Sequence, residues 1–196
     1  IVSNQFFHIK YLVPTKLIVE VEYIEKGKVN SVSRAFSLKE YQLKNKYILP
    51  LKGNIWSLWG PTTGSSHHRQ TAAQEFAYDF MMFDSKGKIH KNKGLKNSDY
   101  YCFKKEIIAP ASGKVIIAKD GLAENTKLNE TLPLDMEKIK KWGFLHALGG
   151  NVIVIEHKNN EYSFIAHCVK GSIKVKEGQR VKQGQPLAQL GNTGNS

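Results

Sequence analysis

Two adjacent histidines, His67 and His68, precede Asp79 in the stretch His-His-Arg-Gln-Thr-Ala-Ala-Gln-Glu-Phe-Ala-Tyr-Asp. Imidazole and carboxylate groups are common ligands of catalytic zinc ions, which take three ligands from the protein and keep a fourth position open. The stretch therefore contains residue types for two corners of such a site. By itself it fits a solvated loop followed by a strand at least as well, so the interpretation depends on the remainder of the chain.

The apolar run from Glu75 to Phe83 predicts a strand that contains Asp79. Because side chains alternate between the two faces of a strand, Asp79 is expected on the face opposite Tyr78 and Phe80. A carboxylate buried there without a partner would be costly, and either a bound cation or a salt bridge would offset the cost.

The remaining elements are mostly short strands. Alternation over residues 16–24, a turn at 26–28 and a second strand to Phe36 predict a small antiparallel β module over residues 1–48. A mainly β domain is expected over residues 49–196, with a long connection at 122–148 that contains a short helix around residues 134–142. The expected later strands are 151–157, 161–167, 173–175, 180–181 and 187–190.

Length and composition indicate a globular chain. Its 196 residues are 41% hydrophobic, no apolar run approaches the roughly 20 residues that span a bilayer, and no signal peptide begins at Ile1. A first residue other than Met indicates a processed or trimmed chain, so the missing signal says nothing about the compartment.

The chain is strongly basic: it has 29 Lys and Arg residues against 17 Asp and Glu residues, which gives a formal net charge of +12. Such a surplus favours anionic surroundings, such as nucleic acid, acidic lipid or an anionic envelope polymer. The lysines do not alternate with aromatic residues as they do in single-strand binding grooves, so no nucleic-acid partner is expected.

The two cysteines, Cys102 and Cys168, are far apart and form no Cys-x-x-Cys pair. The sequence therefore indicates neither a cysteine zinc site nor a disulfide scaffold, and leaves open one disulfide or two buried thiols.

Five motifs follow one another in the second half of the chain: Ala109-Pro-Ala-Ser-Gly-Lys-Val, Gly150-Asn-Val-Ile-Val-Ile-Glu-His, Tyr162-Ser-Phe-Ile-Ala-His, the Gly-rich run 171–185, and Leu190-Gly-Asn-Thr-Gly-Asn-Ser. In this order they resemble the lysostaphin/LytM-type zinc metallopeptidases, which are peptidoglycan endopeptidases. The resemblance covers about residues 49–196. It implies an antiparallel β-sheet peptidase unit, similar to a duplicated hybrid motif, with a groove above the sheet.

The resemblance also implies roles for individual residues. His68, or its neighbour His67, and Asp79 correspond to zinc ligands, and His167 to a groove residue that assists catalysis without binding the metal. The spacing between His68 and Asp79 is longer than the common His-x-x-x-Asp of the family and is similar to a subgroup with a longer loop. Cys168 stands where the family usually has Leu.

The family pattern continues with His-x-His, whose second His is the third zinc ligand and whose first is a catalytic base, but this sequence ends at Ser196. A turn with nothing after it would leave a sheet edge unpaired, so we expect a missing tail that carries the last strands. With two protein ligands in place of three, this fragment is expected to bind zinc weakly and to be inactive or crippled.

For the intact protein the resemblance implies a secreted or envelope-located, monomeric zinc endopeptidase that cleaves peptidoglycan peptides. The basic surface is compatible with contact to anionic envelope polymers. The alternative is a non-catalytic homologue that binds the wall or activates another hydrolase. A biotinyl- or lipoyl-type carrier domain shares some motifs, but it requires a modifiable Lys in a tight hairpin, such as Met-Lys-Met, that is absent here.

Overall fold

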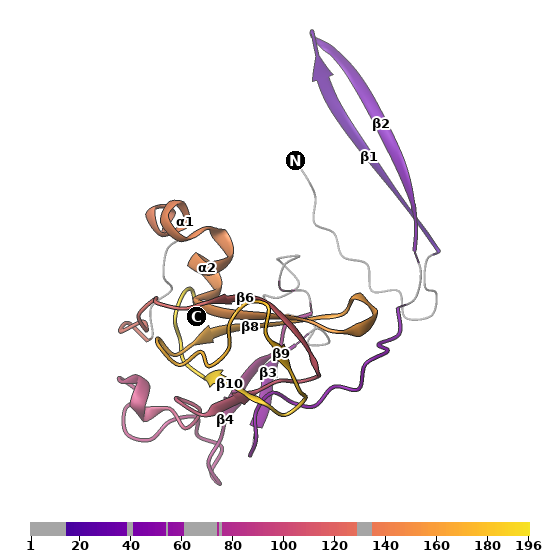
Figure 1. Ribbon diagram of the computed structural model, residues 1–196. Helices are drawn as coiled ribbons and strands as arrows, with labels where there is room; N and C mark the ends of the chain where they lie inside the picture. The colour runs from indigo at the N-terminus through magenta and orange to yellow at the C-terminus, as the bar shows by residue number, and fades with distance from the viewer. Residues whose placement is uncertain (1–14, 39–40, 54, 61–73, 75, 129–134) are drawn as a thin grey trace. The chain divides into compact units, whose positions relative to one another are not determined.

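A computed structural model describes residues 15–38, 41–53, 55–60, 74, 76–128 and 135–196 (Figure 1). The chain divides into two compact units, Ile1–Leu43 and Lys44–Ser196. The boundary expected from the sequence, between residues 48 and 49, remains a prediction.

The described part of the first unit is a β-hairpin of β1 (Lys16–Glu25) and β2 (Lys28–Ser37). The strands pair antiparallel in the register that places Glu25 opposite Lys28. The two residues between them, Lys26 and Gly27, both have positive φ, 51° and 76°. This is the backbone of the two-residue turns that match strand twist in hairpins. The hairpin predicted from alternation and the Lys-Gly-Lys turn is confirmed.

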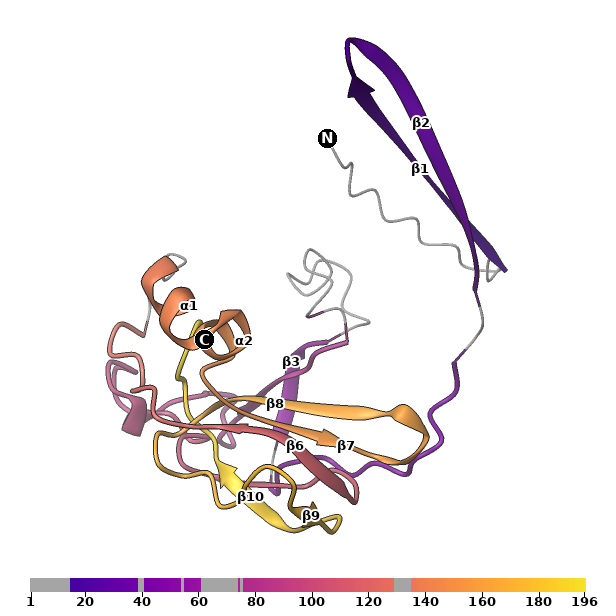
Figure 2. The same cartoon turned by 45° about the horizontal axis from the view of Figure 1, so that its top comes forward.

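The second unit is built on a four-stranded antiparallel sheet with the order β8-β7-β6-β9 (Figure 2). Its strands are β6 (Gly113–Lys119), β7 (Asn151–Glu156), β8 (Tyr162–Cys168) and β9 (Arg180–Val181). In β7, Val152 and Ile153 are adjacent and both completely buried. Since adjacent side chains point to opposite faces, this strand is covered on both faces, which explains its unbroken apolar sequence.

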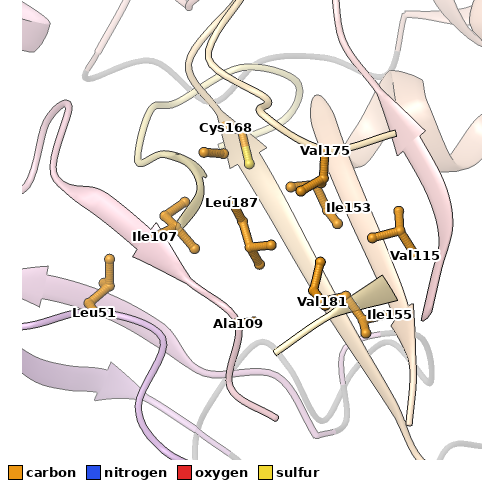
Figure 3. Close-up of a cluster of buried hydrophobic side chains, with 11 residues drawn as sticks. Leu51, Ile107, Ala109, Val115, Ile153, Ile155, Cys168, Val175, Val181 and Leu187 are labelled. Carbon is orange, nitrogen blue, oxygen red and sulfur yellow. The ribbon is translucent and has the colours of Figure 1, made fainter. Parts of the chain in front are cut away.

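Two smaller antiparallel sheets complete the unit. One pairs β5 (Glu106–Ile108) with β10 (Pro186–Gln189), and the other pairs β3 (Ile55–Trp59) with β4 (Asp79–Met82). Side chains of the main sheet, of β5 and β10, and of the loops at residues 51, 109 and 175 form one buried core (Figure 3). Its members are Leu51, Ile107, Ala109, Val115, Ile153, Ile155, Cys168, Val175, Val181, Leu187 and Ala188. The expectation of a mainly antiparallel β fold is confirmed.

The long connection between β6 and β7 contains α1 (Met136–Trp142), the predicted helix, and α2 (Phe144–Gly149), which the sequence analysis missed. The side chain of Asp135 caps α1 by accepting the backbone N–H of Lys138 at 3.0 Å. Short 3-10 turns lie at Asn97–Asp99 and Lys158–Asn160. No helix within the described ranges is long and apolar enough to cross a membrane.

Two strand predictions were wrong: one strand is shorter than expected, and the other does not form. Of the apolar run 75–83, the structure describes residues 76–83, and within these only Asp79–Met82 form a strand, β4. Residues 173–175 form no strand, although the backbone N–H of Lys174 bonds to the carbonyl of Leu187 at 2.8 Å. This one hydrogen bond satisfies the N–H of Lys174, but it does not continue into the regular series of bonds that defines a strand pair.

The buried carboxylate of Glu161 joins the start of the second unit to the turn between β7 and β8. It accepts hydrogen bonds from the backbone N–H of Lys44 at 2.6 Å, from the side chain of Asn45 at 2.6 Å and from the hydroxyl of Tyr47 at 2.7 Å. Only 6% of the residue is exposed. Because a buried carboxylate is costly without donors, these contacts fix residues 44–47 on the sheet.

Replacing Glu161 with alanine is expected to lower the free energy of unfolding by roughly 2–4 kcal/mol, because several charge-assisted hydrogen bonds disappear together. Urea denaturation measures the effect. Glu156→Ala is the matched control, since this carboxylate lies on the same hairpin and makes, among the described residues, a long 3.5 Å contact to Tyr162. Equal destabilisation by the two variants would contradict the prediction.

The two cysteines are free thiols and both are buried. Burial raises the pKa of the Cys168 thiol to about 12, with a further contribution from the charge of Asp120, and burial also raises the pKa of Cys102. Of the two options left open by the sequence, the structure has two buried thiols and no disulfide.

Neither thiol is expected to react in the native protein at about pH 8, because the thiolate is the nucleophile and is scarce well below the thiol pKa. A colorimetric thiol titration should detect no reaction in buffer and both cysteines after unfolding in urea. Rapid labelling of the native chain would contradict the prediction, and so would a missing thiol in urea.

Candidate active site

Of the residues that the sequence analysis assigned to the site, Asp79 and His167 lie in the described part of the chain. His67 and His68 lie outside the described residues. The structure therefore places two of the predicted site residues, one on β4 and one on β8.

Asp79 is the first residue of β4 and is half-buried. Its Cα partner on β3 is Trp59. The rings of Tyr78 and Phe80 stack with their centroids 6.1 Å apart. These two side chains share a face, so Asp79 points to the opposite one, as strand alternation predicted.

His167 is the penultimate residue of β8 and has a φ of 59°, in the left-handed region that a non-glycine residue rarely adopts. The pairing of β7 and β8 is irregular between Asn151 and Ile153, near this point of the ladder. The backbone carbonyl of His167 accepts the N–H of Gly191 at 3.0 Å. A strained backbone held by such contacts is a feature of functional sites.

The imidazole Nδ1 of His167 lies 2.7 Å from the backbone carbonyl oxygen of Thr193. A carbonyl oxygen only accepts hydrogen bonds, so Nδ1 carries the proton and donates it. The neutral ring then has its lone pair on Nε2. This is the tautomer that can accept a proton from, or bond to, a group in front of Nε2.

Burial lowers the pKa of His167, while the bond to the Thr193 carbonyl and the negative charge of Asp79 act in the opposite direction. The influence of Asp79 means that the carboxylate and the imidazole lie within electrostatic range, although they are distant in the sequence. The net direction favours a neutral imidazole at neutral pH. In the folded chain, the neutral imidazole of His167 is therefore within range of the charge of Asp79.

The turn after β10, residues 191–196, is fixed by hydrogen bonds of Thr193. Its hydroxyl accepts the backbone N–H of Asn151 at 2.9 Å and donates to the carbonyl of Cys168 at 2.9 Å. The turn also packs against Gly150, where an added Cβ would collide with Thr193. The carbonyl that bonds His167 is thus held by the ends of β7 and β8.

Two other histidines are structural. His157 is buried, with Nδ1 3.0 Å from the carbonyl of Ser112 and Nε2 2.7 Å from the hydroxyl of Ser163. His146 is buried, with Nδ1 2.6 Å from the carbonyl of Gly150. With both ring nitrogens bonded inside the fold, His157 has no free nitrogen with which to act in a groove.

Within the residues that the structure describes, no three His, Cys, Asp or Glu side chains gather as a metal site. Asp79 is the only predicted ligand in this part of the chain. Its carboxylate is a suitable zinc donor, and it is half-buried at the start of a paired strand. The donor chemistry at this position fits a zinc ion.

Comparison with known sequences decides the family. The sequence model of peptidase family M23 matches residues 96–196, which is half of the chain. The chain belongs to peptidase family M23. This confirms the predicted membership among the lysostaphin/LytM-type peptidases. The M23 match includes His167 and Thr193 and begins after Asp79.

Among solved structures, the M23 chain is similar to the crystal structure of a Pseudomonas aeruginosa protein provisionally described as peptidase M23. The identity is 17% and the TM-score 0.40, over 93% of this chain and 64% of that protein. The chain thus spans less than two thirds of that relative. No curated protein matches the sequence.

The sequence analysis missed the residues that hold His167 in place. Thr193 lies in a motif that carried the resemblance, but nothing in the sequence indicated that its carbonyl meets an imidazole. Asn125, whose contacts to the same turn are described below, lies in the long connection and matched no motif.

Proposed function

We propose that the protein containing this chain is a zinc-dependent endopeptidase that cleaves peptidoglycan peptides. The observation that carries the proposal is the hydrogen bond from Nδ1 of His167 to the Thr193 carbonyl, in the part of the chain that matches peptidase family M23. An imidazole held with its lone pair on Nε2, together with a carboxylate metal donor at Asp79, suits metal-assisted peptide hydrolysis.

His68, or His67, and Asp79 would hold the zinc ion, together with a third protein ligand, which the family pattern assigns to a histidine. A zinc ion bound there would polarise the scissile carbonyl and lower the pKa of a bound water toward neutrality. The family pattern supports this ligand set, and the carboxylate of Asp79 has the right donor chemistry.

His167 would act as a proton carrier and hydrogen-bond partner through Nε2. The bond from Nδ1 to the Thr193 carbonyl holds the ring in one orientation and keeps the lone pair on Nε2. Burial lowers the pKa of the imidazole, so that the ring is neutral and able to accept a proton near pH 7. Once protonated, the same nitrogen can hydrogen-bond a developing oxyanion or donate to the leaving amine.

The net charge of +12 supports action in an anionic environment such as the bacterial cell wall, and with it a secreted or envelope location. We propose that the protein works there as a monomer on wall peptides. Contact with anionic envelope polymers would increase its concentration at the substrate.

The test uses the full-length protein. Its zinc content is measured by elemental analysis, and digestion of purified peptidoglycan is followed through newly formed amino groups. We expect one zinc ion per chain, release of amino groups, loss of activity with a chelator and recovery with zinc. Binding to peptidoglycan without cleavage would overturn the proposal in favour of a non-catalytic wall-binding protein.

A further inference from the structure

The segment that follows β6 is joined to the turn that holds His167. The side-chain nitrogen of Asn125 donates to the backbone carbonyl of Asn192 at 2.7 Å and to that of Gly194 at 2.8 Å. One amide group has two N–H donors, and both are used on the residues that flank Thr193. Asn125 therefore holds the turn from both sides of the residue whose carbonyl meets the imidazole.

The backbone of Asn125 takes part in the same network. Its carbonyl accepts from the side chains of Asn97 at 3.0 Å and Asn192 at 3.3 Å, and the side chain of Asn192 also donates to that of Asn97 at 2.9 Å. The preceding residue, Glu124, forms an antiparallel bridge with Thr193. Three separate segments, around residues 97, 125 and 192, are thus linked by amide hydrogen bonds.

We propose that Asn125 is a positioning residue for His167. By fixing the carbonyls of Asn192 and Gly194, it fixes the intervening carbonyl of Thr193, which selects the imidazole tautomer with the proton on Nδ1. The inference rests on the proposed function for its catalytic consequence, because the selected tautomer leaves Nε2 free for proton transfer. The bonds of Asn125 to Asn192 and Gly194, and the bond of His167 to Thr193 between them, are properties of the fold.

The chemistry of the amide makes this role specific. Aspartate has the same shape but no N–H, so it would place carboxylate oxygens against two carbonyl oxygens. Alanine removes both donors without repulsion. In either variant the carbonyls of Asn192 and Gly194 lose their bonds to Asn125, while the hydroxyl bonds of Thr193 to β7 and β8 remain.

The first measurement needs no catalysis. The 196-residue chain is labelled with ¹⁵N in histidine, and the imidazole shifts of His167 are recorded at about pH 8, where a buried neutral ring is expected. Wild type should show a protonated Nδ1 and an unprotonated Nε2, with widely separated shifts. In Asn125→Ala and Asn125→Asp the two shifts should converge as the second tautomer becomes populated.

Asn45→Ala is the matched control, because the side chain of Asn45 also makes two short hydrogen bonds, to Lys158 and Glu161. Those contacts lie at the other end of β8, so the shifts of His167 should not change. Amide spectra of β6 and β7 confirm that each variant is folded. Unchanged His167 shifts in a folded Asn125→Ala chain would overturn the inference.

The second measurement uses the full-length protein. Asn125→Ala should lower kcat by about 10- to 100-fold, the range typical of residues that orient a catalytic group, while KM and zinc content stay unchanged. A rise in KM alone would overturn the positioning role. If the wild-type protein cleaves nothing, the proposed function fails, and the ¹⁵N experiment still decides whether Asn125 sets the tautomer of His167.

Discussion

Replacing Asp79 with alanine should abolish zinc binding and lower kcat/KM of the full-length protein by more than about 100-fold, beyond the 10- to 100-fold typical of residues that only orient a ligand. The carboxylate would be one of three protein ligands. Burial lowers the pKa of His167, and the negative charge of Asp79 opposes this shift. Loss of the carboxylate would remove a metal donor and an electrostatic partner of the imidazole together. Zinc content and peptidoglycan digestion measure the two effects.

Asp84→Ala provides the control, since this carboxylate lies five positions further along the chain and has a local role. It accepts the backbone N–H groups of Lys86 and Lys88, both at 2.9 Å. These bonds lower its pKa, and they hold a surface loop. The Asp84 variant should retain stoichiometric zinc. If the Asp79→Ala protein also retains stoichiometric zinc, Asp79 is not a zinc ligand and the prediction is wrong.

A second large effect is expected at Gly150, where the turn carrying Thr193 packs on the backbone. Gly150 has a φ of 69° and a ψ of −140°, close to a region open almost only to glycine. An added Cβ would also collide with the carbonyl and hydroxyl of Thr193. Backbone strain and overpacking together predict that Gly150→Ala lowers the free energy of unfolding by roughly 3–5 kcal/mol.

Thermal unfolding should reveal this as a fall in Tm of roughly 10 °C for a domain of this size. Gly171→Ala is the matched control, because Gly171 has a similar φ of 73° but no atom within 4 Å of an added Cβ. In that variant the free energy of unfolding should fall by only about 1–2 kcal/mol, because a residue with a Cβ disfavours the left-handed backbone. If both variants lose the same stability, the packing of the turn on Gly150 contributes nothing measurable.

Several elements could be predicted from the sequence because local patterns determine them. The hairpin β1–β2 follows from alternation and a Lys-Gly turn, and β7 follows from an apolar run bounded by Gly150 and a polar segment. The helix α1 follows from a capping Asp135 and its later lysines. These signals depend on neighbours within a few residues, which sequence reading can evaluate.

Other elements depended on distant contacts. The run 75–83 has strand composition throughout, yet among its described residues, 76–83, the strand is Asp79–Met82, the part that pairs with β3. Residues 173–175 have strand composition as well but form no ladder. Composition gives the tendency to extend, and tertiary pairing decides where the strand begins and ends.

For the site, the sequence by itself determined which residue types are available and, through the order of its motifs, which family they belong to. Asp79 and His167 were both assigned in this way. Only the tertiary structure placed them within electrostatic range, gave His167 its positive φ and directed its Nδ1 to Thr193. It also revealed Asn125 beside the same turn. The physical reason is that hydrogen bonds between distant segments depend on sheet register and loop packing, which no local pattern encodes.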